Sequence, residues 1–115
     1  MTNYAHGHEA EKHAAEYLKK QGYKVLELNW RRPRAEIDIV ARTKRGPVTF
    51  VEVKYRESHA QGGGFDYITP RKLEQMQFAA ELWVAENRFE GEYVLAALEM
   101  AGVDYEVTNF LPELS

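Results

Sequence analysis

Two short stretches in which apolar and charged residues alternate dominate the middle of the chain. The first, at 35–40, reads Ala-Glu-Ile-Asp-Ile-Val, and the second, at 50–54, reads Phe-Val-Glu-Val-Lys. Runs of Val and Ile are typical of buried strands. A charged side chain inside such a run costs free energy unless it is paired or holds a metal ion. We therefore expect the chemistry of the protein to lie on these two strands.

Two segments have the spacing of amphipathic helices. The first covers about 7–21, and its apolar residues form one stripe: Ala10, Ala14, Tyr17 and Leu18. Gly22 follows that stripe, where a glycine commonly ends a helix. The second helix begins with Thr69 as N-cap and Pro70 at the first helical position, and ends near Asn87. Glu11 falls on the inward face of the first helix, which favours a functional role, although a first-turn acid can also serve only the helix dipole.

Five further segments are predicted to be strands. They span 23–30, 35–41, 48–55, 93–98 and 103–108. The first three are joined by turns at 31–34 and 43–47 and should form an antiparallel meander. The third strand, the second helix and the fourth strand form a βαβ unit, so these two strands should be parallel and the apolar fourth strand internal. The predicted fold is α/β (α+β), of order αβββαββ, with a mixed central sheet flanked by helices in one domain over 1–115.

The register of the hairpin between the second and third strands decides which charges meet. A turn centred on Arg45 places Asp38 opposite Glu52, and Glu36 opposite Lys54. Opposed Cβ atoms lie about 4.5–5.5 Å apart, so the two carboxylates would repel unless a cation lies between them. A hard divalent ion such as Mg²⁺ or Mn²⁺ fits carboxylate oxygens best. Lys54 points to the same face as Glu52 and could polarise an attacking water or stabilise charge on a phosphate.

A simpler interpretation is a salt-bridge ladder of Glu36, Glu52 and Lys54 on a solvent-exposed face. Three observations favour the functional interpretation. The acids are flanked by Ile and Val, Asp is disfavoured in strands, and Glu11 independently points inward.

Composition narrows the class of protein. The chain has no cysteine, which excludes disulfides and thiolate metal sites and fits a cytoplasmic location. No apolar run approaches the roughly 20 residues that a membrane span needs, and no signal core precedes the first helix. The triple glycine at 62–64 lacks the Gly-Lys-Ser/Thr ending of a phosphate-binding loop, and we expect a mobile connection there.

Charge is unevenly distributed along the chain. The net charge is −3, yet residues 31–72 carry ten Lys and Arg against five Asp and Glu. A basic region beside acids suits a polyanionic substrate with a divalent cation. Ordinary solvated charge would give the same pattern.

With these residues in view, the sequence resembles a known group of proteins. Asp38 followed by Glu52 and Lys54 across a hairpin resembles the signature of PD-(D/E)xK nucleases, which have the restriction-endonuclease-like fold. Over nearly its whole length the chain resembles more closely the small bacterial YraN family, which is related to archaeal Holliday-junction resolvases. The matching segments are Glu11 with the stripe of the first helix, Gly22-Tyr23, Asn29-Trp30-Arg31, Glu36-Ile37-Asp38, 50–56, and Thr69 with Lys72.

The chain departs from the family pattern at two places. Ala10 and Ala35 stand where the family usually has glycine. Glu92-Tyr93-Val94 stands where it tends to have Arg-Phe-Asp. The catalytic set itself is intact.

The resemblance implies a role for each of these residues. Asp38 and Glu52 match the metal ligands, Lys54 matches the catalytic lysine, and Glu11 matches the helix-borne acid that helps to hold the metal. The implied activity is hydrolysis of DNA phosphodiester bonds by a Mg²⁺- or Mn²⁺-dependent endonuclease, with branched, Holliday-junction-like DNA as substrate. A chain this small is expected to act on both strands as a homodimer. The side chains expected on the DNA backbone are basic: Arg31, Arg32, Arg34, Arg56 and Lys72.

Two other functions stay open at this point. A non-catalytic nucleic-acid-binding module that kept the fold would bind DNA in a salt-sensitive manner even after Glu52→Ala. A protein-interaction domain with a vestigial site would have no affinity for DNA near physiological salt. The net negative charge of the chain keeps the second alternative open.

Overall fold

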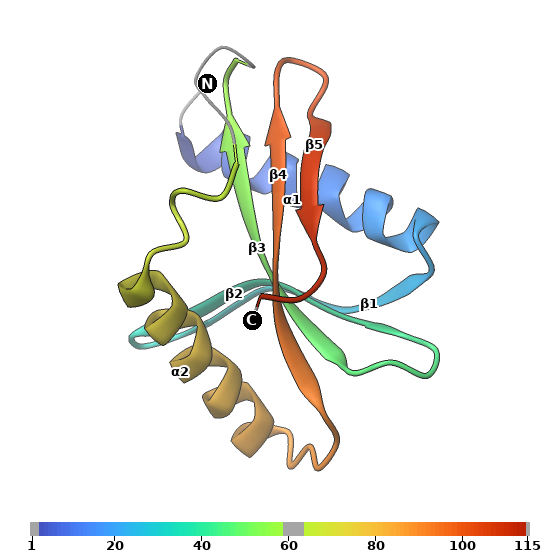
Figure 1. The fold of residues 1–115 in the computed structure, drawn as a ribbon, viewed down its shortest axis with the longest axis vertical. Helices are drawn as coiled ribbons and strands as arrows, with labels where there is room; N and C mark the ends of the chain where they lie inside the picture. The colour runs from blue at the N-terminus through green and yellow to red at the C-terminus, as the bar shows by residue number, and fades with distance from the viewer. Residues whose placement is uncertain (1–2, 59–63, 115) are drawn as a thin grey trace.

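The elements of the fold follow the predicted order. The computed structural model describes residues 3–58 and 64–114, with side chains from residue 7 onward, so Gly62 and Gly63 of the triple glycine lie outside the described residues. The elements are α1 (Asn3–Lys20), β1 (Tyr23–Arg32), β2 (Ala35–Thr43), β3 (Val48–Arg56), α2 (Pro70–Glu86), β4 (Tyr93–Ala101) and β5 (Glu106–Leu111), as Figure 1 shows.

The strands form the expected mixed sheet. Their order is β1-β2-β3-β4-β5, and β2 is antiparallel to both β1 and β3. β3 and β4 are parallel, and β5 returns antiparallel to β4. The prediction that the apolar fourth strand is internal is confirmed, because β4 has a strand on each side.

The two helices cover opposite faces of the sheet (Figure 1). Ala14 and Leu18 of α1 pack against Ile39, Val51 and Leu98 in one buried cluster. On the other face, α2 contributes a second buried cluster: Ala79, Ala80 and Trp83 against Val40, Val48 and Phe50. The chain therefore has the α+β architecture of the restriction-endonuclease-like fold, and both faces of β2 and β3 are covered over much of their length.

The ends of the elements differ from the prediction in ways that have local causes. α1 begins at Asn3, β1 and β4 run two and three residues beyond the expected ends, and β5 starts at Glu106 in place of 103. Gly102 and Tyr105 adopt positive φ angles of 83° and 51°, and the Tyr105 amide donates to the Gly102 carbonyl. This tight turn occupies the residues that were expected to open the last strand.

The start of α2 agrees with the sequence signals. Thr69 is extended, and its hydroxyl accepts the backbone amide hydrogen of Lys72 at 3.1 Å. Pro70 follows at the first helical position. Within the described part of the chain, no helix is long and apolar enough to cross a membrane.

Candidate active site

The predicted register of the β2–β3 hairpin is confirmed, but its ladder is shorter than expected. Four pairs follow the predicted register, from Arg42–Val48 to Ile39–Val51. The ladder ends there, one position before Asp38 and Glu52 would pair. The Val53 backbone amide instead donates to Asp38 Oδ2 at 2.7 Å. At the point where strand pairing stops, a side chain of β2 thus accepts a hydrogen bond from the backbone of β3.

Asp38 carries the strongest electrostatic perturbation among the predicted site residues. Burial raises its pKa well above the ordinary value, and the negative charge of Glu52 raises it further. The hydrogen bond from Val53 works in the opposite direction, while the charge of Glu11 adds to the increase. Its surroundings therefore disfavour the ionised form of Asp38.

Glu11 reaches this carboxylate from α1. A side-chain hydrogen bond with Asp38 acts to lower the pKa of Glu11. Burial raises the pKa of Glu11, although the hydrogen bond and the nearby charges of His8 and Arg31 oppose that increase. The inward direction predicted for Glu11 is confirmed, because a solvent-facing side chain could not make this bond.

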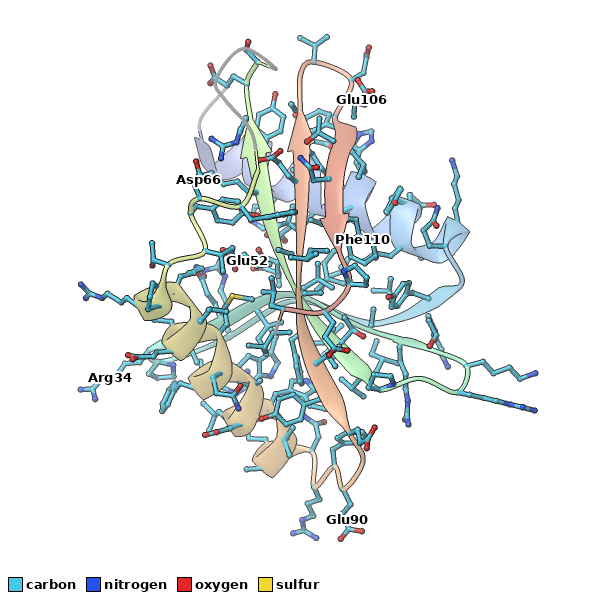
Figure 2. All side chains as sticks on the ribbon, in the orientation of Figure 1. Arg34, Glu52, Asp66, Glu90, Glu106 and Phe110 are labelled. Carbon is cyan, nitrogen blue, oxygen red and sulfur yellow. The ribbon has the colours of Figure 1, made fainter. Side chains whose placement is uncertain are left out.

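Glu52 has a cationic partner that was expected elsewhere. Lys72 Nζ lies 2.9 Å from Glu52 Oε2, and the two side chains are 27% and 19% exposed. Burial alone would lower the pKa of Lys72, but the hydrogen bond and charge of Glu52 leave it above the ordinary value. Lys72 is therefore protonated and neutralises Glu52. Figure 2 shows Glu52 inside the molecule, between β3 and the start of α2.

The acids do not form a ready-made metal cage. Among the described side chains, no group of three His, Asp or Glu residues is arranged to hold a metal ion. The contacts explain why, since Glu52 is turned to Lys72 and Asp38 accepts from Val53. The chemistry of the donor set nonetheless fits a hard divalent cation, because the carboxyl groups of Glu11, Asp38 and Glu52 interact electrostatically.

The expected pairing of Glu36 with Lys54 does not form. Glu36 instead accepts from Arg31 Nη1 at 2.8 Å, across the β1–β2 ladder. Lys54 lies beside β4, where its ladder partner is Glu99, and its ammonium sits 5.7 Å from the centre of the Tyr67 ring. The reason is again that the β2–β3 ladder has ended before these positions.

Tyr67 is a neighbour of the site that sequence reasoning missed. Its hydroxyl is buried and has no hydrogen-bond partner in the described part of the structure. Burial raises its pKa, and the charges of Glu52 and Glu99 raise it further, so the hydroxyl stays protonated. Its position after the glycine-rich connection, outside any periodic segment, gave no signal.

Arg56 is held away from solvent by a second network that the sequence did not reveal. Its Nε donates to Glu99 Oε2 at 2.9 Å, and Glu99 is only 2% exposed. Thr108 Oγ1 and Asn109 Nδ2 of β5 also donate to Glu99 Oε1. The guanidinium predicted to contact DNA is thus already engaged in a buried ion pair. Glu99 escaped notice because it lies just past the expected end of its strand.

The other predicted DNA contacts gather around one pocket. A cavity of about 410 Å³ lies between the β1–β2 turn and the first half of α2, and Glu52 is part of its wall. The basic residues that line it are Arg31, Arg32, Arg34 and Lys72.

The cations of this pocket differ in how firmly they are held. Arg32 pairs with Glu86 at 2.8 Å and covers the Trp30 ring, and Arg31 pairs with Glu36. Arg34 occupies the β1–β2 turn with a φ of 67° and projects outward beside α2 (Figure 2). The arrangement brings positive charge against the acid cluster from one side, which suits an anionic ligand.

Comparison with known proteins places the chain in a family. The model of the uncharacterised protein family UPF0102 matches residues 10–100, a range that contains the predicted site residues. A UPF0102 protein of Trichlorobacter lovleyi is 45% identical over 86 residues, which cover 75% of this chain and 68% of the relative.

Two further relatives extend the match. A UPF0102 protein of Shewanella loihica is 34% identical over 113 residues, 95% of this chain and 98% of the relative. One of Syntrophotalea carbinolica is 38% identical over 100 residues, 84% and 80% of the two chains. The chain therefore belongs to the UPF0102 family, which is the YraN family that its sequence resembles.

Proposed function

We propose that the protein is a metal-dependent endonuclease that hydrolyses phosphodiester bonds in DNA. The observation that supports this most is the gathering of Glu11, Asp38 and Glu52 where the β2–β3 ladder ends, with the pKa of Asp38 raised by burial and by its acidic neighbours. A divalent cation would relieve that repulsion. Acids that converge in this way beside a basic pocket suit phosphate chemistry better than a salt-bridge ladder on a solvent-exposed face.

Asp38 and Glu52 would hold the ion, and Glu11 would assist from α1. A bound Mg²⁺ or Mn²⁺ supplies an activated water and neutralises charge on the phosphate. Lys54 places a positive charge on the same strand as Glu52, where it would stabilise the negative charge that develops on the phosphate oxygens. Asp38 keeps its orientation through the Val53 amide, which fixes one of its oxygens.

The basic pocket would bind the sugar–phosphate backbone. The positively charged side chains of Arg31, Arg34 and Lys72 line the same pocket as Glu52. Such contacts position a nucleic acid without reading its sequence. The finer parts of the proposal are branched DNA as the preferred substrate, a homodimer as the acting unit and a cytoplasmic location. They rest on the family resemblance, on the size of the chain and on the absence of cysteine.

A cleavage assay tests the proposal. Linear duplex, flap and four-way-junction DNA are incubated with Mg²⁺, with Mn²⁺ or with EDTA. We expect cleavage only with a divalent ion, and a loss of at least about 100-fold in Asp38→Ala and Lys54→Ala. Glu16→Gln serves as the matched control, because it removes an exposed α1 carboxylate that pairs only with Lys19 in the described structure.

The outcomes separate the competing functions. DNA binding without cleavage under all these conditions would contradict the proposal and favour a non-catalytic nucleic-acid-binding module. Absence of DNA binding near physiological salt would favour a protein-interaction domain. Cleavage that survives both site substitutions would indicate a contaminating nuclease.

A further inference from the structure

Lys72 lies where its side chain could control access to the carboxylate of Glu52. Its ammonium contacts Glu52 at 2.9 Å, and its backbone amide donates to the Thr69 hydroxyl in the N-cap of α2. The cap fixes the backbone at the start of a long helix, so only the flexible side chain of Lys72 can move. A lysine side chain has four carbons and reaches alternative partners easily.

The same ammonium faces two kinds of ligand site. It neutralises Glu52 at the edge of the acid cluster, and it also lines the 410 Å³ pocket together with Arg31 and Arg34. Lys72 therefore lies between a carboxylate that suits a metal ion and a space that suits a phosphate. Arg31 and Arg32 do not share this position, because Arg31 pairs with Glu36 and Arg32 with Glu86.

We propose that Lys72 is an exchangeable cation that couples metal binding to substrate binding. Without ligands, its ammonium occupies Glu52 and competes with a divalent ion for that carboxylate. When a nucleic-acid strand enters the pocket, the ammonium moves to a phosphate oxygen and Glu52 becomes free to bind the metal. This inference rests on the proposed function and assigns Lys72 a positioning role that acts through Glu52.

The consequence is a thermodynamic linkage. A metal that must displace Lys72 binds weakly to the free protein, and a phosphate that draws Lys72 away removes this competition. By reciprocity, bound metal must strengthen binding of the strand by the same factor. Typical couplings of this kind are about 5- to 150-fold. A merely structural ion pair would stay closed with both ligands bound and would give no such effect.

Metal affinity measured without any cleavage tests the inference. Mn²⁺ is titrated into wild-type protein, Lys72→Gln, Lys72→Arg and Arg71→Gln, with free Mn²⁺ followed by electron paramagnetic resonance. We expect Lys72→Gln to bind Mn²⁺ about 10-fold more tightly than wild type in the absence of DNA. Lys72→Arg retains the cation and should stay near wild type. Arg71→Gln controls for loss of a positive charge on the adjacent exposed residue and should change the affinity less than about 2-fold.

The titration is then repeated with a saturating phosphorothioate DNA duplex. We expect the duplex to tighten Mn²⁺ binding about 10-fold in wild type and clearly less in Lys72→Gln. Thermal unfolding of each variant checks that it is folded. Equal Mn²⁺ affinity in wild type and Lys72→Gln, or equal tightening by DNA, would overturn the inference while leaving the proposed function standing.

The failure of the proposed function looks different. If wild type binds Mn²⁺ and shows the Lys72-dependent coupling but cleaves no DNA, only the nuclease activity is overturned. If no variant binds Mn²⁺ with or without the duplex, both proposals are overturned.

Discussion

Asp38 is a carboxyl group in an environment that disfavours its charge. Burial and the charge of Glu52 raise its pKa, and the single amide from Val53 offsets only part of that effect. A carboxyl group whose pKa is raised on folding contributes most to stability when it is protonated, and that contribution is lost as the pH rises through the folded-state pKa. Ionisation of Asp38 as the pH rises through its folded-state pKa therefore destabilises the metal-free fold.

Replacing this charge should stabilise the protein. We expect Asp38→Asn to raise the free energy of unfolding at pH 7 by roughly 1–2 kcal/mol, because the amide oxygen can still accept from Val53 while the repulsion disappears. The difference should shrink as the pH falls and disappear below pH 3.8, the ordinary value for Asp, since both folded and unfolded states then hold the proton. Urea unfolding at a series of pH values measures this effect.

The exposed Asp66 provides a control for the substitution. Asp66→Asn removes a carboxylate outside the acid cluster and should leave the free energy of unfolding nearly unchanged. A variant Asp38→Asn that is less stable than wild type at pH 7 would show that the carboxylate is already compensated in the metal-free protein.

Some of these site residues could be predicted from the sequence. Asp38, Glu52 and Glu11 could be found because charge stood out against apolar periodicity, and the turn at Arg45 set their register correctly. Tyr67 had no such contrast and lies outside any periodic segment. The partner of Glu52 was not predictable either, because Lys72 lies 20 positions further along the chain and only tertiary packing brings the two together.

At the scale of elements, β3, β4 and β5 are tied together by one buried acid. Glu99 of β4 accepts hydrogen bonds from Arg56 of β3 and from Thr108 and Asn109 of β5. Burial alone would raise its pKa, but these donors leave the pKa of Glu99 below its ordinary value. A group whose pKa is lowered on folding stabilises the protein above its unfolded-state pKa and loses that contribution as the pH falls.

Glu99→Gln should therefore destabilise the fold in a pH-dependent manner. We expect a loss of about 2 kcal/mol in the free energy of unfolding at pH 7, because Arg56 keeps a hydrogen-bond partner but loses its buried counter-charge. The loss should diminish below pH 4.5, the ordinary value for Glu, as wild-type Glu99 also becomes protonated. Chemical unfolding at pH 7 and at pH 3.5 measures both quantities.

A matched acid on the surface sharpens this comparison. Glu90→Gln alters an exposed carboxyl group between α2 and β4, and its effect should be within about 0.5 kcal/mol at either pH. A destabilisation by Glu99→Gln that persists unchanged at pH 3.5 would contradict the ionised state assigned to Glu99.

The elements themselves followed from periodicity, whereas their ends did not. Helical spacing found α1 and α2, and the Thr69-Pro70 signal located the start of α2 to the residue. β5 begins three residues later than predicted because Tyr105 adopts a left-handed conformation, which the residue type does not indicate. The end of the β2–β3 ladder was also hidden, since it depends on a hydrogen bond from the backbone to the Asp38 side chain.

At the scale of the whole molecule, the sheet brings together side chains from both covering helices. Glu11 comes from α1 on one face, and Lys72 comes from α2 on the other (Figure 1). Glu11 and Lys72 lie next to Asp38 and Glu52, at the point where pairing between β2 and β3 stops. Acids from the sheet and from a helix are therefore close together there. The basic pocket opens on the α2 side of this point. The fold thus places an acid cluster and a cavity lined by basic side chains next to each other.

The most direct test of the cation site is a crystal structure of the protein soaked with Mn²⁺, with the metal located by its anomalous scattering. We predict one strong peak in contact with the carboxylates of Asp38 and Glu52, with Lys72 displaced from Glu52. Glu11 should lie on the same side of that peak as Asp38. A crystal soaked at a saturating Mn²⁺ concentration that shows no peak between Asp38 and Glu52, with Lys72 still in contact with Glu52, would contradict the proposed metal site.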